Sequence, residues 1–309
     1  KDNSGAENHC TIFTIAESPL SDQVIWVGTD DGNVQVTKDG GKSWSNVTAN
    51  ITGLPANTWC YHIEASKFGE GIAYAVFDGH TKNDKNAYAY KTTDFGATWK
   101  SIVTDDVYGF ARSFQEDLEN ENLLFLGTEF GLYITVDGGM NWSKFTNNMP
   151  STAIHYLTMQ EKTNDLVMGT HGRGIIILDD VSPLRQIKPE ILNEKLVFLK
   201  TPATEMWEES TFGGTSTETQ FVGSNPNRAA KIIYYMKKRH TFGKMSMTVY
   251  DMDGNKVTVL SPKKQKGINI VNWNYVMTAP TVAKGKTFSF GGMTAPRVEA
   301  GKYKVVIQK

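Results

Sequence analysis

The sequence has few cysteines, no long apolar run and no excess of charge of one sign. Its 309 residues include 2 cysteines, Cys10 and Cys60. These are too few for a disulfide framework and do not fit the spacing of a zinc site. No run of about 18 apolar residues is present, so the sequence predicts no membrane-spanning helix. Lysine plus arginine (32) balance aspartate plus glutamate (33), so nothing favours nucleic acid as a partner.

Glycine and aromatic residues, in contrast, are abundant, with 28 glycines and 11% aromatics. This composition favours an all-β protein with many turns, and the length suggests two domains. Residues 1–5 contain no methionine and no apolar signal core, so we expect the interior of a longer polypeptide or a mature cut end. Cys10 and Cys60 begin candidate strands at corresponding places. They are therefore either bridged or simply two small buried residues.

A repeated octad is the strongest pattern in the sequence. Residues 37–44, 92–99 and 135–142 share the form Thr-x-Asp-x-Gly-x-[Ser/Thr/Asn]-Trp. Their aspartates are 55 and 43 residues apart, a spacing that suits four-stranded propeller blades. The residues that define the motif are Asp39, Gly41, Trp44, Asp94, Gly96, Trp99, Asp137, Gly139 and Trp142.

Each octad residue has a structural role in a tight hairpin turn. The aspartate accepts hydrogen bonds from backbone N–H groups further along the turn, and the glycine supplies a positive φ. The tryptophan packs its apolar face under the blade. We therefore expect Trp44, Trp99 and Trp142 to be largely buried, and the octads to support the fold rather than bind a substrate.

A strand that ends in a polar, glycine-containing turn accompanies the octads as a second signature. It occurs at 27–32, 75–80, 126–131 and 168–174. The two patterns predict four blades, at about 9–50, 58–104, 108–148 and 153–187. The last blade has no complete octad and is followed by Pro183, which cannot donate to a sheet. Because four blades are few for such a propeller, we expect further blades, in an absent part of the chain or in a partner.

The octads, together with the run 170–180, resemble Asp-box (bacterial neuraminidase repeat) propellers. They are most similar to the sortilin-type propeller proteins of Bacteroidetes-like bacteria. The resemblance covers about 9–187 and implies a secreted, periplasmic or outer cell-surface protein. The class includes sialidases, xyloglucan-cleaving enzymes, sorting receptors and photosystem assembly factors, so the resemblance predicts a fold and leaves the function open.

The C-terminal part of the sequence has no octad. Residues 188–215 are interpreted as a linker with one strand, after the blades at 1–187. Short strand patterns follow at 219–222, 229–236, 245–250, 256–260, 268–275 and 303–307. They favour an Ig-like β-sandwich at 216–309.

Two further features concern the role of this C-terminal part. The runs 249–257, 267–274 and 300–305 resemble bacterial Ig-like or fibronectin-like modules, which implies a spacer, a sheet cap or a support for export. The pattern Asp251-x-Asp253-Gly254 imitates the start of a calcium loop but has Pro262 where such a loop has its glutamate. We interpret it as a hairpin turn.

Carboxylates just after the second-signature strands are the catalytic candidates. They are Asp30, Asp31, Asp78 and Glu129. Because these positions repeat from blade to blade, we expect them on one face, where a glycosidase would need two carboxylates across the scissile bond. The alternative is solvated turn residues with local hydrogen bonds. The few arginines of the blades, Arg112, Arg173 and Arg185, do not predict the arginine cluster of a sialidase.

Histidines and one arginine are the ligand-binding candidates. His171 and Arg173 lie between glycines in 170–174, in a loop that either contacts a ligand or is a tight turn whose arginine pairs with Glu129 or Asp179. His62 and His155 occupy similar inner-strand places and would line the central channel. Two histidines on different blades do not make a metal site, so we predict neither a metal nor another cofactor.

These observations favour a secreted or cell-surface protein that binds a polypeptide or a glycan on one propeller face. The alternative is a glycoside hydrolase whose carboxylate pair lies partly in missing blades, and an assembly or export factor is a third hypothesis. Paired carboxylates on the face would favour the enzyme, whereas an aromatic and polar face would favour binding.

Overall fold

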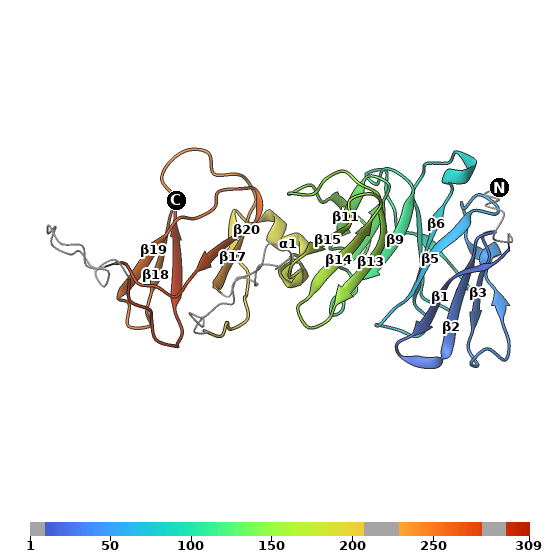
Figure 1. Ribbon diagram of the computed structural model, residues 1–309, viewed down its shortest axis with the longest axis horizontal. Helices are drawn as coiled ribbons and strands as arrows, with labels where there is room; N and C mark the ends of the chain where they lie inside the picture. Colours follow the sequence, from blue (N-terminus) through green and yellow to red (C-terminus); the bar gives the residue numbers. More distant parts are fainter. Residues whose placement is uncertain (1–9, 207–228, 280–294) are drawn as a thin grey trace, which may run out of the picture. The chain divides into compact units, whose positions relative to one another are not determined.

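The computed structural model describes residues 10–206, 229–279 and 295–309. Two compact units make up the chain, Lys1–Lys188 and Pro189–Lys309. We call them the propeller unit and the C-terminal unit (Figure 1). Within the described ranges, no helix has the length and apolar character needed to cross a membrane.

The propeller unit contains four antiparallel sheets, in each of which consecutive strands pair (Figure 1). Blade 1 comprises β1 (Ile12–Ser18), β2 (Ser21–Thr29), β3 (Val34–Thr37) and β4 (Ser45–Asn46). Blade 2 comprises β5 (Trp59–Ala65), β6 (Ala73–Asp78), β7 (Tyr88–Thr92) and β8 (Lys100–Ser101). Blade 3 comprises β9 (Ala111–Glu116), β10 (Leu124–Thr128), β11 (Gly131–Thr135) and β12 (Ser143–Lys144). The predicted all-β propeller blades are confirmed.

Blade 4 has three strands in the described residues, β13 (Ile154–Gln160), β14 (Asp165–Thr170) and β15 (Ile175–Leu178). The 3-10 helix η3 (Ser182–Gln186), with Pro183 at its start, follows β15. The missing donor of Pro183 suits a chain that leaves the sheet. Two further 3-10 helices, η1 (Thr48–Asn50) and η2 (His80–Lys82), lie in blades 1 and 2.

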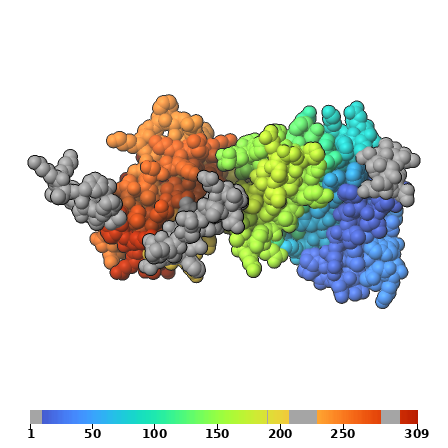
Figure 2. All heavy atoms as spheres, viewed as in Figure 1, coloured from blue at the N-terminus to red at the C-terminus, as the bar shows by residue number. Residues whose placement is uncertain are grey.

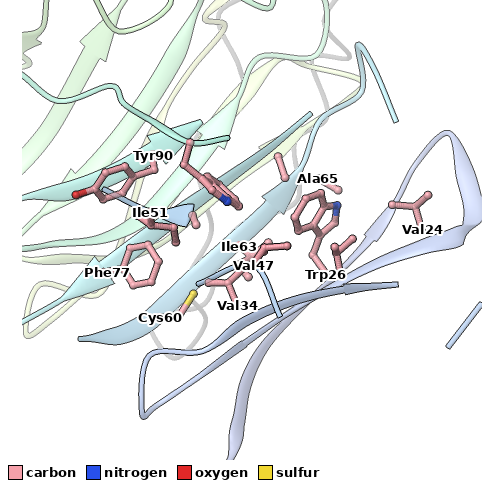
Figure 3. Packing of buried hydrophobic residues seen from close by; sticks show 14 residues of the cluster. Val24, Trp26, Val34, Val47, Ile51, Cys60, Ile63, Ala65, Phe77 and Tyr90 are labelled. Atoms are coloured by element: carbon pink, nitrogen blue, oxygen red, sulfur yellow. The ribbon is translucent and has the colours of Figure 1, made fainter. Parts of the chain in front are cut away.

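The cores of the propeller unit lie between neighbouring blades. In β6, Ala73, Ala75 and Phe77 pack with blade 1, whereas Tyr74 and Val76 pack with blade 3. Successive strand residues point to opposite faces, so a strand covered on both faces is apolar throughout. Figure 3 shows side chains of blades 1 and 2, among them Val34 and Cys60, filling the space between the two sheets.

The octads form the predicted hydrogen-bonded turns. In each, an aspartate oxygen accepts the backbone N–H four residues on, at 2.9 Å from Ser43 to Asp39, 2.8 Å from Thr98 to Asp94 and 2.9 Å from Asn141 to Asp137. The hydroxyl of the leading threonine donates to the same aspartate and accepts the N–H of the octad glycine. Hydrogen bonds, first that from the Ser43 hydroxyl, lower the pKa of Asp39 to about 2.

The expectation that all three octad tryptophans are buried is wrong for Trp44, which is 42% exposed, against 9% for Trp99 and 5% for Trp142. The buried pair packs on the preceding blade. Trp142 Nε1 donates to Ile102 O of blade 2 at 2.6 Å, and the Trp99 ring meets Trp26 of blade 1 edge to face. The described residues contain no blade before blade 1, so Trp44 has no such surface.

The two cysteines, both within the described residues, are not bridged. Cys10 lies exposed at the start of the described chain, whereas Cys60 is fully buried between blades 1 and 2. Burial raises the pKa of the Cys60 thiol. Its sulfur lies so close to Gly28 that a Cβ there would be 2.4 Å away, so Cys60 is a core residue of the blade junction.

The described residues of the C-terminal unit form two three-stranded antiparallel sheets. One has the order β16 (Leu196–Phe198), β17 (Ala230–Met236), β20 (Gly267–Trp273), and the other β19 (Lys256–Leu260), β18 (Ser246–Tyr250), β21 (Lys304–Gln308). One apolar cluster includes Tyr234 and Trp273 from the first sheet and Met247 and Val249 from the second. Two sheets on a common core form a β-sandwich. The Ig-like relationship of this sandwich stays a prediction.

The segment interpreted as a linker begins with ordered structure. Helix α1 (Pro189–Asn193) precedes β16, which pairs with β17 as an edge strand of the C-terminal unit. Residues 207–215 of the interpreted linker and the strand expected at 219–222 lie outside the described residues. The turn between β18 and β19 is the predicted hairpin, in which Asp251 accepts the backbone N–H of Asn255 at 2.8 Å.

Candidate functional site

A β-bulge interrupts the first strand of every blade at the same place. The pairing of β1 with β2 skips Phe13, that of β5 with β6 skips Tyr61, that of β9 with β10 skips Arg112, and that of β13 with β14 skips His155. A bulge leaves one residue unpaired and redirects its side chain. The first strands also contact one another from blade to blade, so the four redirected side chains come from adjacent strands.

These side chains form one continuous group around Arg112. We call it the Arg112 cluster, and its members are Phe13, Trp59, Tyr61, Asp78, His80, Phe110, Arg112, His155 and His171. The Arg112 Nε donates to Asp78 Oδ2 at 2.7 Å, and its Nη1 lies 2.7 Å from His155 Nε2. The Asp78 side chain is fully buried and the Arg112 side chain is largely buried. The ion pair between the Arg112 guanidinium and the Asp78 carboxylate is therefore shielded from water.

Aromatic rings hold the guanidinium from two sides. The Arg112 Cζ lies 5.0 Å from the centre of the Tyr61 ring and 4.9 Å from that of Phe110, distances at which a cation is attracted by ring faces. Phe13, Trp59 and Tyr61 contact one another, with ring centres 4.6 to 5.1 Å apart. Phe13 is 41% exposed. The cluster therefore extends from a buried ion pair to an accessible aromatic surface.

Histidines form the other side of the Arg112 cluster. His80 Nδ1 lies 2.8 Å from Asp78 Oδ1, and the His80 ring stacks on Phe110. His155 and His171 stack with ring centres 5.2 Å apart. Burial, then the positive charge of Arg112 and the proximity of His171, lower the pKa of His155. The lowered pKa favours the neutral form of His155 beside Arg112, while His171 is exposed.

The four catalytic candidates differ in their surroundings. Asp78 is bound by Arg112 and His80, as described above. Asp30 Oδ1 accepts the backbone N–H groups of Cys10 and Thr11 at 2.9 and 2.8 Å. Asp31 accepts hydrogen bonds from Thr29 Oγ1 and Asn33 Nδ2. Glu129 differs, because its Oε2 is buried and has no hydrogen-bond partner among the described residues. Three of the four carboxylates thus have local structural bonds.

The predicted recurrence of the turn positions from blade to blade is seen in the backbone hydrogen bonds. Asp30, Glu129 and His171 each donate a backbone N–H to the residue that precedes the first strand, namely Thr11 O, Phe110 O and Ala153 O. Asp78 pairs with Trp59 at the same position. Asp30, Asp78, Glu129 and His171 therefore lie at the same end of their blades. Asp78 and His171 belong to the Arg112 cluster, because the Asp78 side chain contacts Arg112 and the His171 ring stacks on His155.

The remaining ligand-binding candidates lie outside the Arg112 cluster. His62 is the residue after the bulge, so the counterpart of His155 in blade 2 is Tyr61, and the expected equivalence of His62 with His155 is wrong. His62 Nε2 lies 4.0 Å from Glu64 Oε2. Arg173 is exposed and makes no hydrogen bond or ion pair within the described part of the chain, so it does not pair with Glu129 or Asp179. The loop around Arg173 has Gly172 and Gly174 at φ of 82° and 67°.

Sequence reasoning did not select Arg112, Tyr61 or His80 as site residues. Arg112 and Tyr61 were overlooked because a bulge shifts the alternation of a strand by one residue. His80 is the first residue of η2, and its Nδ1 lies 2.8 Å from Asp78 Oδ1 and 3.3 Å from Arg112 Nη2.

Comparisons with known proteins agree with this fold. No family model matches the chain. A stretch of 96 residues is 27% identical to the oligoxyloglucan-reducing end-specific xyloglucanase of Emericella nidulans and covers 28% of this chain and 10% of that enzyme. The chain thus spans a small part of this curated relative.

Solved structures with similar folds include YCF48 bound to a D1 peptide, at 18% identity and a TM-score of 0.42, over 56% of this chain and 52% of that one. The GH74 xyloglucanase of Xanthomonas campestris gives 13% identity and a TM-score of 0.48, over 62% and 32%. YCF48 from Cyanidioschyzon merolae gives 16% and 0.41, over 56% and 54%. The chain spans about half or less of these proteins. The sortilin-type resemblance stays a prediction.

Proposed function

We propose that the propeller unit is a binding module that takes a polypeptide or a glycan at the Arg112 cluster. The observation that supports this proposal most directly is the bulge in each first strand, which places four side chains, Phe13, Tyr61, Arg112 and His155, in one group. A bulge costs ladder hydrogen bonds, and bulges are frequent beside functional sites.

The chemistry of the Arg112 cluster suits a binding role. Aromatic rings offer apolar area with little loss of conformational freedom, and they are frequent in ligand and partner sites. Next to the cluster, Tyr156 is 64% exposed, and Arg173 is exposed, with no hydrogen-bond or ion-pair partner among the described residues. Both groups are available to stack on or donate to a ligand. We further propose a secreted, periplasmic or outer cell-surface location, as the Asp-box resemblance implies.

A glycoside hydrolase is the second candidate. It is favoured by the buried, unpartnered Oε2 of Glu129 and by the 27% identity to a xyloglucanase over 96 residues. The reaction needs a second carboxylate across the bond, and Asp78, Asp30 and Asp31 are bound to neighbouring groups. Hydrolysis of xyloglucan oligosaccharides by the chain, lost in Glu129→Gln, would favour the enzyme over the binding module.

The binding proposal is tested with the 309-residue chain on a glycan array and a peptide library. For a ligand found there, Tyr156→Ala and Arg173→Ala are each expected to weaken binding by about tenfold or more, because central aromatic and arginine contacts dominate affinity. Phe242→Ala and Arg239→Ala are matched controls, since both side chains are exposed in the C-terminal unit. The absence of any ligand, or equal losses in the controls, contradicts the proposal.

A further inference from the structure

Two stacked aromatic rings lie at one end of blade 3, beside its glycine-containing turn. The rings of Tyr108 and Phe130 have centres 5.1 Å apart and planes 15° from parallel. Tyr108 is 65% exposed, whereas Phe130 is half-buried. Blade 3, green in Figure 2, packs between blades 2 and 4, and both rings belong to loops outside its strands. The exposure of Tyr108 therefore does not depend on a blade face that lacks a neighbour.

The loop that carries Tyr108 is positioned by two features of its backbone. The Tyr108 backbone N–H donates to Tyr133 Oη at 3.2 Å. Gly109 follows at a φ of 86°, and a Cβ there would lie 2.8 Å from Phe130 Cδ2, so a glycine is needed for the loop to pass Phe130 this closely. The Tyr108 ring is thus exposed on a positioned backbone, and a ligand that stacks on it has little ordering to pay for.

Glu129 brings a carboxylate to the same loop. A Cβ on Gly109 would lie 3.2 Å from the Glu129 Cβ, so the two residues are in close proximity. Within the described residues, Glu129 Oε2 is buried and accepts no hydrogen bond, although the residue as a whole is half-buried. Rotation about the last side-chain bond of a glutamate exchanges its two oxygens at low cost. An enclosed carboxylate oxygen without a donor costs free energy, which a donor from a ligand would offset.

Asp78 shows which partner a carboxylate at this position takes in blade 2. Asp78 and Glu129 occupy the same position in blades 2 and 3. Asp78 accepts a hydrogen bond from Arg112, whose guanidinium lies beside two aromatic rings and which comes from the bulge of the following blade. The bulge that follows Glu129 supplies His155, and its Nε2 lies next to Arg112 instead. Glu129 and the two stacked rings therefore match an arginine site that lacks its arginine.

We propose that Tyr108, Phe130 and Glu129 form a subsite for an arginine side chain of a polypeptide ligand. The planar guanidinium stacks on the exposed Tyr108 ring and donates to the Glu129 carboxylate. Asp105 and Asp106, exposed on the same loop, add negative charge that attracts a cation. The inference rests on the proposed binding role of the propeller unit and selects a polypeptide rather than a glycan as the ligand.

The arginine subsite adjoins the Arg112 cluster. Glu129 donates its backbone N–H to Phe110 O, and Phe110 is a member of that cluster and lies two residues after Tyr108. A polypeptide on the Arg112 cluster can therefore place one arginine over the Tyr108 ring. Lys144 of β12 lies beside Gly131, but it gives no hydrogen bond to Glu129 Oε2, so this oxygen is available to a ligand.

Citrulline, which has the shape of arginine without its charge, tests the subsite. The peptides that bind the full chain in the library should contain arginine, and citrulline in its place should weaken binding by about tenfold or more in calorimetric titrations. With Glu129→Gln and with Tyr108→Leu, the preference for arginine over citrulline should shrink to about a few fold, because interacting groups do not act additively. Tyr108→Phe keeps the ring and should keep the preference.

Phe68→Leu and Glu70→Gln are the matched controls, since both residues are exposed in the loop between β5 and β6, at the opposite end of the blades. Neither should change the preference for arginine. Peptides that bind equally well with citrulline, or a preference that Glu129→Gln leaves intact, overturn the arginine subsite and leave the binding role of the propeller unit standing. Binding of glycans alone has the same meaning. The absence of any peptide or glycan ligand overturns both proposals.

Discussion

Trp142 and Trp44 occupy the same place in two octads but have different neighbours. Trp142 is buried and donates a hydrogen bond to Ile102 O, whereas Trp44 is 42% exposed. Trp142→Ala should therefore lower the free energy of unfolding by about 3–5 kcal/mol. Trp44→Ala should change it by less than about 1 kcal/mol. Urea unfolding at low protein concentration measures both, and equal losses would show that the octad tryptophan acts within its own blade.

Glu64 should make the stability of the propeller unit depend on pH. Its Oε1 accepts hydrogen bonds from Gln115 Nε2 and from the backbone N–H of Glu116, while its Oε2 is buried and has no hydrogen-bond partner in the part of the chain that the structure describes. Burial, opposed by His62 nearby, raises the pKa of Glu64 above its ordinary value of 4.5. The folded state thus keeps this proton to higher pH than the unfolded state. The stability from the protonated carboxyl is present below pH 4.5 and is lost as the pH rises through the folded pKa.

The variant Glu64→Gln keeps an acceptor at Oε1 and carries no charge. Between about pH 5 and about pH 7, its urea midpoint should fall less than that of the unmodified chain. Glu70→Gln, at an exposed glutamate of the same blade, is the control and should follow the unmodified chain. A parallel pH dependence of all three proteins would contradict the raised pKa. Burial also raises the pKa of Glu116. Glu116 is present in all three proteins and contributes to the pH dependence of each.

At the scale of strands and turns, the sequence predicts what local patterns determine. The octad turns at Asp39, Asp94 and Asp137 close by hydrogen bonds within eight residues, so their pattern is sufficient to predict them. The bulge at Tyr61 depends on the register with β6, which single-strand alternation does not reveal. The exposure of the Trp44 side chain depends on whether a neighbouring blade packs against it. The site was thus predicted in part, through Asp78, His155 and His171, and its centre at Arg112 was not.

The 3-10 helix η3 replaces an octad in blade 4, and one arginine holds it in place. Arg185 Nε donates to Asp117 Oδ2 at 2.8 Å, and Nη2 donates to Asn164 Oδ1 at 2.8 Å. The Asp117 side chain is fully buried, so removing its partner leaves a buried charge unpaired, at a cost of about 3–5 kcal/mol. Arg185→Met should therefore release η3 and speed amide exchange of residues 182–187.

The matched control for this prediction is Arg185→Met combined with Asp117→Asn, which removes the unpaired charge. The double variant should recover part of the protection, because residues in one ion pair do not act additively. Amide exchange measured by mass spectrometry distinguishes blade 4 from the other blades. Uniform acceleration over all four blades in Arg185→Met would show global unfolding rather than a role of Arg185 in holding η3.

At the scale of the whole molecule, the two units have separate cores. Trp142 lies in a cluster of the propeller unit, and Trp273, which is 5% exposed, lies in the cluster of the C-terminal unit. Domains with their own cores unfold as separate cooperative units unless a large apolar interface joins them. Calorimetry should therefore show two transitions, with Trp142→Ala lowering one midpoint and Trp273→Ala the other.

The size of each shift follows from the burial of the two tryptophans. A loss of about 3–5 kcal/mol per substitution in a unit of this size corresponds to roughly 2–4 °C for each kcal/mol. The unaffected transition in each variant is the internal control, because it reports on the same sample. A single transition that both substitutions lower together would mean that the units unfold as one, and the C-terminal unit would then contribute directly to the stability of the blades.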